Sequence, residues 1–258
     1  MKIEKLAEII EKTSPLDLQE QWDNSGFQIK FDGAEIKKVL VAMEITDEVI
    51  DEAELLEVGA IVTHHPLIFD PVRRVYDNEI AGNHLVRLIK NDINVYSSHT
   101  PFDKCAGGNN DYLAGLLDLY DVKIMETDPD GFCRTGLVRL PAPAGEYAAA
   151  VCDRLGIDRR SAVFCGDPGE TVKKAGLCTG AGADYIEKAK EAGCDIFITG
   201  DVKYHQAQSA REMGVNVLDI GHYGSEKIFT ENMAGYLREN TTLAVIESAV
   251  YLDPFVLL

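Results

Sequence analysis

The feature that most constrains the fold of this chain is a long stretch of sequence that occurs twice. Residues 25–53 align without a gap on residues 161–189, with Gly33 on Gly169 and a Lys-Lys pair at the same place in both segments. Matching strand and helix patterns continue beyond these segments. Such self-similarity predicts an internal duplication. It is a better explanation than two unrelated α/β segments that happen to share common residue types.

Each copy predicts the same order of elements. The helical 3.6-residue patterns cover residues 3–12, 47–57, 80–90 and 109–118 in the first copy, and 145–155, 183–192, 203–213 and 225–238 in the second. Short buried strands are expected at 60–63 and 93–97, and at 195–199 and 215–219. Continuous apolar runs such as VLVAM and DIFIT between helical patterns are typical of α/β units with largely parallel strands.

The domain organisation follows from the repeat. No Pro- or Ser-rich linker separates the copies, and the best boundary lies near residues 127–131. We therefore expect residues 1–126 and 127–258 to form two similar α/β halves. Without a linker, the halves should pack face to face about a pseudo-two-fold axis, with a site in the cleft between them. Exchange of strands between the halves would intertwine them and blur this boundary.

The charge balance narrows the classes of partner. The chain has 43 acidic and 25 basic residues, which give a formal net charge of −18. A surface this acidic repels phosphate backbones and anionic lipid, so nucleic-acid and membrane-surface binding are disfavoured. The six cysteines form no C-x-x-C pair, and no apolar run approaches the length of a membrane span. We expect a soluble, cytoplasmic protein with reduced thiols.

The strongest local signal for chemistry is the sequence Thr-His-His-Pro at residues 63–66. The apolar strand AIVT ends at His64 and His65, and ligands gather at the carboxyl ends of parallel strands. Adjacent histidines point in different directions, so one strand end can serve two neighbouring metal ions. A pair of chance surface histidines is a poor alternative at the end of a buried strand.

A histidine followed four residues later by an acid occurs once in each copy. His99 and Asp103 follow one predicted strand, and His222 and Glu226 follow its counterpart. A tight turn into a helix brings the carboxylate back toward the histidine, so each pair is a candidate for metal binding. Asp103 is equally compatible with a loop cap, and Glu226 with a favourable position at a helix N-terminus.

The ligands are divided between the copies rather than repeated. The second copy has Gly200 and Asp201 where the first has the two histidines. The candidate metal ligands are therefore His64, His65, Asp103, His222 and Glu226. Five ligands exceed the three that a mononuclear catalytic zinc usually takes from protein, and fit two ions with a bridging carboxylate. Two such ions activate water, so hydrolysis is the expected chemistry.

Other residues near these strand ends have more than one interpretation. His99 is a candidate proton donor, orienting residue or substrate contact, and packing alone explains it equally well. The Gly180-Ala181-Gly182 turn fits a phosphate site weakly and a simple tight turn better. Asp201, Lys203 and His205 follow the strand equivalent to the one before the two histidines, where they can line the same cleft; Lys203 also fits an exposed helix position.

Five motifs together resemble one family. They are QWDNSG (21–26), GAIVTHHPLIF (59–69), SSHTPFD (97–103), TGDVKYH (199–205) and GHYGSE (221–226). The chain is similar to the Nif-three-like family, also called GTP cyclohydrolase I type 2-like or dinuclear metal-centre proteins, in its short bacterial form. The resemblance implies a duplicated α/β fold, the same five metal ligands and a ring-like homohexamer. Pro101-Phe102 and Ala181 depart from the family pattern.

Two functions from different classes follow. The first is a metal-dependent hydrolase of a nucleotide-like or small phosphorylated substrate, similar to GTP cyclohydrolase, in which Glu226 bridges two divalent ions and His99 transfers a proton. The alternative is a non-catalytic metal-binding protein for regulation or metal delivery. Histidine and carboxylate ligands accept Zn, Fe, Mn, Ni or Co, so the sequence leaves the metal open. A ring that threads nucleic acid conflicts with the acidic charge.

Overall fold

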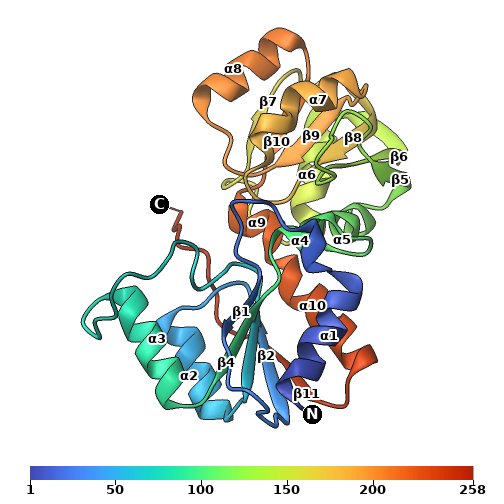
Figure 1. The fold of residues 1–258 in the computed structure, drawn as a ribbon. Coiled ribbons are helices and arrows are strands. Elements are labelled where there is room, and N and C mark those ends of the chain that lie inside the picture. Colours follow the sequence, from blue (N-terminus) through green and yellow to red (C-terminus); the bar gives the residue numbers. More distant parts are fainter. Residues whose placement is uncertain (258) are drawn as a thin grey trace. The chain divides into compact units, whose positions relative to one another are not determined.

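The computed structural model describes residues 1–257, which form two compact units of mixed α/β structure (Figure 1). The first unit contains residues 1–108 and 229–252, and the second contains residues 109–228 and the described residues after 252. The chain thus leaves the first unit after Gly108 and returns to it at Phe229. The boundary expected near residue 126 lies inside the second unit, so the compact units divide the chain differently from the expected halves 1–126 and 127–258.

The sheet of the first unit has five strands in the order β1-β4-β3-β2-β11. Their bounds are Gly26–Ile29 for β1, Lys38–Ala42 for β2, Ala60–Thr63 for β3, Asn94–Ser97 for β4 and Ala244–Glu247 for β11. β11, β2, β3 and β4 are parallel, and β1 pairs antiparallel with β4 at the edge. β3 and β4 are buried along their whole length, as expected for apolar strands covered on both faces.

Helices cover both faces of this sheet. They are α1 (Ile3–Thr13), α2 (Asp47–Leu56), α3 (Ile80–Lys90), α4 (Thr100–Lys104) and α10 (Ile228–Asn240), with the short 3-10 helix η1 (Leu16–Leu18). Alternate residues of β2 point to opposite faces. Val39 and Val41 pack in the core that contains buried side chains of α1 and α10, whereas Leu40 and Ala42 pack in the core that contains those of α2 and α3. Figure 1 shows the red α10 beside the blue α1.

The sheet of the second unit has six strands in the order β5-β6-β8-β9-β10-β7. Their bounds are Leu119–Ile124 for β5, Arg134–Pro143 for β6, Val163–Cys165 for β7, Thr171–Leu177 for β8, Ile196–Thr199 for β9 and Asn216–Asp219 for β10. β8, β9 and β10 are parallel, while β5, β6 and β8 form antiparallel pairs and β7 pairs antiparallel with β10. The sheet is mixed, rather than largely parallel as expected.

Helices again cover both faces. They are α5 (Asn109–Leu116), α6 (Ala144–Arg154), α7 (Ile186–Glu191) and α8 (Tyr204–Met213), with α9 (His222–Glu226) and the 3-10 helix η2 (Gly182–Tyr185). Buried residues of α5 and α6 share a core with Ile196 and Ile198 of β9. Buried residues of α7 and α8 share the opposite core with Phe197. No helix within residues 1–257 is long and apolar enough to cross a membrane.

The two sheets contain the same four-strand arrangement. The order β1-β4-β3-β2 in one corresponds to β7-β10-β9-β8 in the other, with the first strand antiparallel to the second in both. The helices that follow these arrangements are placed differently. α5 packs in the second unit although it follows the strands of the first, and most of α10 packs in the first unit although it follows those of the second.

Candidate metal-binding residues

His64 and His65 follow directly after β3, which lies between β2 and β4 in the first sheet. The backbone amides of both histidines donate to the carbonyl of Met43, at 3.0 and 2.9 Å, which fixes the turn after the strand. The side chain of His64 is fully buried, and that of His65 is 23% exposed. The prediction that two histidines end a buried strand is therefore confirmed.

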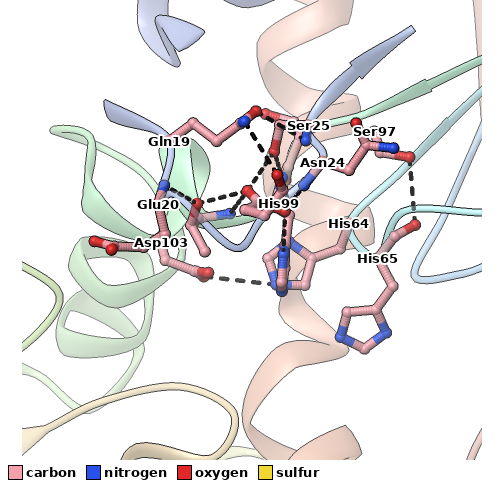
Figure 2. A network of polar contacts seen from close by, with 12 residues as sticks. Gln19, Glu20, Asn24, Ser25, His64, His65, Ser97, His99 and Asp103 are labelled. Atoms are coloured by element: carbon pink, nitrogen blue, oxygen red, sulfur yellow. Dashed lines mark hydrogen bonds and ion pairs between the residues drawn. The ribbon is translucent and has the colours of Figure 1, made fainter. Parts of the chain in front are cut away.

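The orientation of His64 identifies its more basic nitrogen. Nδ1 lies 3.1 Å from the carbonyl oxygen of Ser98 and donates to it, which leaves the lone pair of the neutral ring on Nε2. Nε2 lies 3.6 Å from Oδ1 of Asp103, and Figure 2 shows this contact as a dashed line. A lone pair facing a buried carboxylate is a donor arrangement that suits a divalent cation.

His99 and Asp103 lie at the end of β4, the neighbour of β3. His99 precedes the five-residue helix α4, and the amide of Asp103 donates to the carbonyl of His99 at 3.2 Å. This turn buries the Asp103 carboxylate, and its Oδ1 lies 3.6 Å from Nε2 of His64. One nitrogen from each of His64, His65 and His99 lies within 4.8 Å of the others. Three imidazoles and a carboxylate therefore converge at the carboxyl ends of two adjacent parallel strands.

Asp23 holds His99 in place, a role that the sequence did not reveal. Its Oδ1 accepts from Nδ1 of His99 at 2.8 Å, and the carboxylate also accepts from Ser25 Oγ and from the amide and hydroxyl of Thr100. Burial alone would raise the pKa of Asp23, but hydrogen bonds from His99, Thr100 and Ser25 outweigh it and hold the pKa well below its usual range. The only sequence signal was that Asp23 lies in the QWDNSG motif (21–26).

In the second unit, His222 lies between two carboxylates. Its Nε2 is 2.9 Å from Oε2 of Glu226, four residues later on α9, and its Nδ1 donates to Oδ2 of Asp201 at 2.8 Å. The Glu226 side chain is 5% exposed. Asp201 follows β9 in the left-handed region, with φ of 56°. A carboxylate on Nδ1 fixes the ring and raises the basicity of Nε2, which is the usual support of a metal-binding histidine.

The glycine turn after β8 packs against this pair. A Cβ on Gly180 would lie 2.2 Å from Oε1 of Glu226 and 3.5 Å from Nε2 of His222. The Gly180 amide donates to Ser225 Oγ at 2.8 Å, and the Gly182 amide donates to Thr199 Oγ1 at 2.9 Å. Because both amides bind protein oxygens, the tight-turn interpretation is favoured over a phosphate site. The turn supports Glu226 instead.

Lys203 and His205 are exposed at the start of α8. The His205 ring makes an edge contact with Tyr204, at 5.2 Å between ring centroids. This placement agrees with the alternative that Lys203 is an ordinary exposed residue at a helix start.

The donor set within each unit fits a metal ion chemically. The first unit provides His64, His65, His99 and Asp103, and the second provides His222 and Glu226. Nδ1 of His64, of His99 and of His222 donates to an oxygen, so the nitrogen of each ring that can bind an ion or a proton is Nε2. Imidazole nitrogen and carboxylate oxygen are donors for zinc, iron and related divalent ions.

Comparisons with known proteins agree with this arrangement of motifs. Residues 1–254 match the model of the family described as Duf34/NIF3 (NGG1p interacting factor 3). The chain belongs to the DUF34/NIF3 family. The match extends over nearly the whole sequence, so it covers both units of the fold.

Several relatives have names that refer to one enzyme. A protein of Clostridium perfringens, named GTP cyclohydrolase 1 type 2 homolog, is 36% identical over 88% of this chain and 87% of its own. The GTP cyclohydrolase 1 type 2 of Helicobacter pylori strain J99 is 32% identical over 95% of this chain and 96% of its own. The crystal structure of the Staphylococcus aureus hypothetical protein SA1388 superposes with a TM-score of 0.93 at 27% identity, covering 100% of this chain and 99% of that one.

Proposed function

We propose that this protein is a metal-dependent hydrolase with a dinuclear site built from both units. His64, His65 and Asp103 would come from the first unit, and His222 and Glu226 from the second. The observation that carries the proposal is the convergence of donors within each unit: three imidazole nitrogens within 4.8 Å in one, and a histidine 2.9 Å from a buried glutamate in the other. Family membership supports joining the two groups into one site.

The chemistry follows from the donor set. When bound, two divalent ions would supply Lewis acidity that lowers the pKa of water toward neutrality. Glu226 would help to hold both ions, because its carboxylate is buried and has two oxygens. Asp201 keeps the His222 ring in the tautomer that presents Nε2.

His99 is the proposed proton-transfer residue. Asp23 accepts from its Nδ1, so Nε2 is the atom that accepts a proton and returns it to a leaving group. The buried Asp23 carboxylate accepts from Nδ1 and prevents the ring from turning, which is the role of an orienting acid beside a general base.

The proposed substrate is a nucleotide-like or small phosphorylated molecule. This part of the proposal rests on relatives that carry the name GTP cyclohydrolase 1 type 2, one of them 32% identical over almost the entire chain. An acidic protein with net charge −18 repels long polyanions, but a pocket with two divalent ions can hold one small anion.

A non-catalytic metal-binding protein, acting in regulation or metal delivery, is the second candidate. One observation favours it: the imidazole of His222 is 36% exposed. A partner's ligand can reach an exposed histidine and take over the metal. This alternative predicts the same metal content as the hydrolase and no turnover.

Three further features belong to the proposal. The shared four-strand order in the two sheets supports an internal duplication, with residues 1–126 and 127–258 as the two copies. The resemblance to the family supports a homohexamer, which sedimentation analysis of the purified protein would test. The six cysteines, none of them in a C-x-x-C pair, support a cytoplasmic location, which fractionation of the source cells would test.

The decisive experiment measures metal content and turnover together. Protein purified without chelator or metal-affinity tag should hold about two ions per chain by mass spectrometry. His64→Ala and Glu226→Gln should lower that number, whereas His205→Ala, an exposed histidine outside the proposed ligands, should not. Metal-dependent loss of GTP or a related nucleotide would support the hydrolase. Two ions without turnover would favour the second candidate, and no ion after anaerobic loading with iron, zinc or manganese would refute both.

A further inference from the structure

Two large aromatic side chains lie exposed beside His99. Trp22 is 56% exposed and Phe69 is 51% exposed. The His99 ring centroid is 5.8 Å from that of Trp22 and 6.4 Å from that of Phe69. His99 itself lies 5.1 Å from His64 and 5.6 Å from His65 by the same measure. The aromatic pair therefore adjoins the candidate metal ligands of the first unit through a single histidine.

The segments that carry the two rings are fixed to each other. The side-chain amide of Asn24 donates to the carbonyl of Ile68 at 2.6 Å, and the amide of Ile68 donates to Oε1 of Gln28 at 3.0 Å. Trp22 also precedes the buried, multiply hydrogen-bonded Asp23. The rings are thus held on an ordered frame, so a ligand would bind them with little additional ordering.

The rings of Trp22, Phe69 and His99 are not stacked on one another. Trp22 and Phe69 lie 6.1 Å apart and are tilted by 42°, and Trp22 meets His99 edge-on at 75°. Neither aromatic residue is paired face to face with another ring of the group. More than half of the surface of each residue is exposed, so a flat ligand can reach both rings.

We propose that Trp22 and Phe69 form the binding site for the planar, nitrogen-containing ring of the substrate and hold that ring beside His99. The proposal rests on the proposed function and specifies its substrate as a nucleobase-containing molecule. Aromatic side chains stack on bases irrespective of base identity, because every base has a π-face. An uncharged base also avoids the repulsion that an acidic surface exerts on phosphate.

The test uses the fluorescence of Trp22, the only tryptophan in the chain. Guanosine, which has a base and no phosphate, should change the Trp22 emission of the metal-loaded protein, and ribose 5-phosphate, which has no base, should not. Phe69→Leu should weaken guanosine binding roughly 5- to 150-fold, the range expected for one stacking contact. Phe255→Leu is the matched control, because Phe255 is also highly exposed and lies in the other unit.

Two variants of Trp22 separate stacking from structure. By equilibrium dialysis, Trp22→Leu should bind guanosine as weakly as Phe69→Leu does, and Trp22→Phe should keep most of the affinity because it retains an aromatic face. Unchanged guanosine affinity in Trp22→Leu and Phe69→Leu would overturn the proposal. So would a Trp22 emission that depends on protein concentration alone, since a second copy of the chain would then cover the rings.

Metal content and turnover in the same preparations distinguish this proposal from the proposed function. Guanosine binding at Trp22 in protein that takes up no metal even after anaerobic loading would support the ring site and refute the hydrolase. Normal metal content and normal turnover of a nucleotide in Trp22→Leu would support the hydrolase and refute the ring site.

Discussion

Replacement of Gly180 by alanine tests whether the turn after β8 positions Glu226. The new Cβ would lie 2.2 Å from Oε1 of Glu226, so the carboxylate must move by about 1 Å to reach an ordinary contact distance. Binding sites tolerate displacements of only about 0.5 Å. The contact of 2.9 Å between Glu226 and His222 would be lost or reoriented.

The magnitude follows from two separate effects. An L-residue in the left-handed region costs about 1 kcal/mol, and Gly180 has φ of 67°. Gly156 has φ of 60°, and a Cβ added there would meet no heavy atom within 4 Å, so Gly156→Ala carries the same backbone strain without the clash. Gly156→Ala should lose about 1 kcal/mol of stability in urea unfolding, and Gly180→Ala should lose at least as much because of the added clash. Only Gly180→Ala should lose metal affinity, by roughly 10- to 100-fold, the usual effect of disturbing a ligand's support.

The assay is a metal titration against a chelator of known affinity, carried out on the wild type and both variants at the same pH. Metal affinity in Gly180→Ala within twofold of that in Gly156→Ala would refute the reasoning. It would mean either that Glu226 is not a ligand or that its carboxylate can move without consequence.

Other perturbations have expected outcomes of their own. Asp23→Asn should lower the free energy of unfolding at pH 7 by about 2–4 kcal/mol, because a buried acceptor of several hydrogen bonds is lost. The folded-state pKa of Asp23 is lowered. Its contribution to the free energy of unfolding is therefore present above the ordinary carboxyl pKa and is lost as the pH falls through the lowered value. The difference in stability between variant and wild type in urea unfolding should shrink in strong acid. Asp201→Asn should weaken metal binding roughly 10- to 100-fold without unfolding the protein, as measured by the same chelator titration; equal affinity would exclude Asp201 as the support of His222. Tyr147→Phe should leave thermal stability unchanged or slightly raised, because the buried Tyr147 hydroxyl has no hydrogen-bond partner among residues 1–257. Tyr96→Phe should cost about 1 kcal/mol of stability, because it loses the hydrogen bond to Glu11. Similar losses in both variants would contradict this account.

Much of the fold could be predicted because periodicity encodes it. The expected helix 80–90 and strand 60–63 coincide with α3 and β3, and helix 47–57 differs from α2 by one residue. These elements are short, apolar on the buried side and ended by turn residues, so local pattern was sufficient. The strands β5, β6 and β11 were not anticipated. β5 is exposed after its first residue, and β6 is buried in its first half and mostly exposed in its second. Neither sequence therefore contains the continuous apolar run that indicates a strand.

The candidate site also contains residues that the sequence could place and residues that it could not. His64, His65, Asp103 and Glu226 could be placed from sequence, since each follows a recognisable strand and its side chain must lie at that strand's end. Asp23 could not be assigned to His99, because 76 residues separate them and only the antiparallel pairing of β1 with β4 brings their segments together. The close packing of Gly180 against Glu226 could not be predicted either, because the two residues are far apart in the sequence and glycine has no side chain to indicate a contact.

The path of the chain through the two units determines which unit can fold first during synthesis. The residues that build the second unit's sheet and cores all lie between Asn109 and Ile228, so that unit can close while later residues are still being added. The first unit cannot. Until α10 and β11 emerge, the core that α1 shares with α10 is incomplete and β2 presents an unpaired edge. The first unit, whose N-terminal segment is synthesised first, is thus the last to be completed. During that interval it exposes apolar surface and an unpaired strand edge, which chaperones bind and which lead to aggregation.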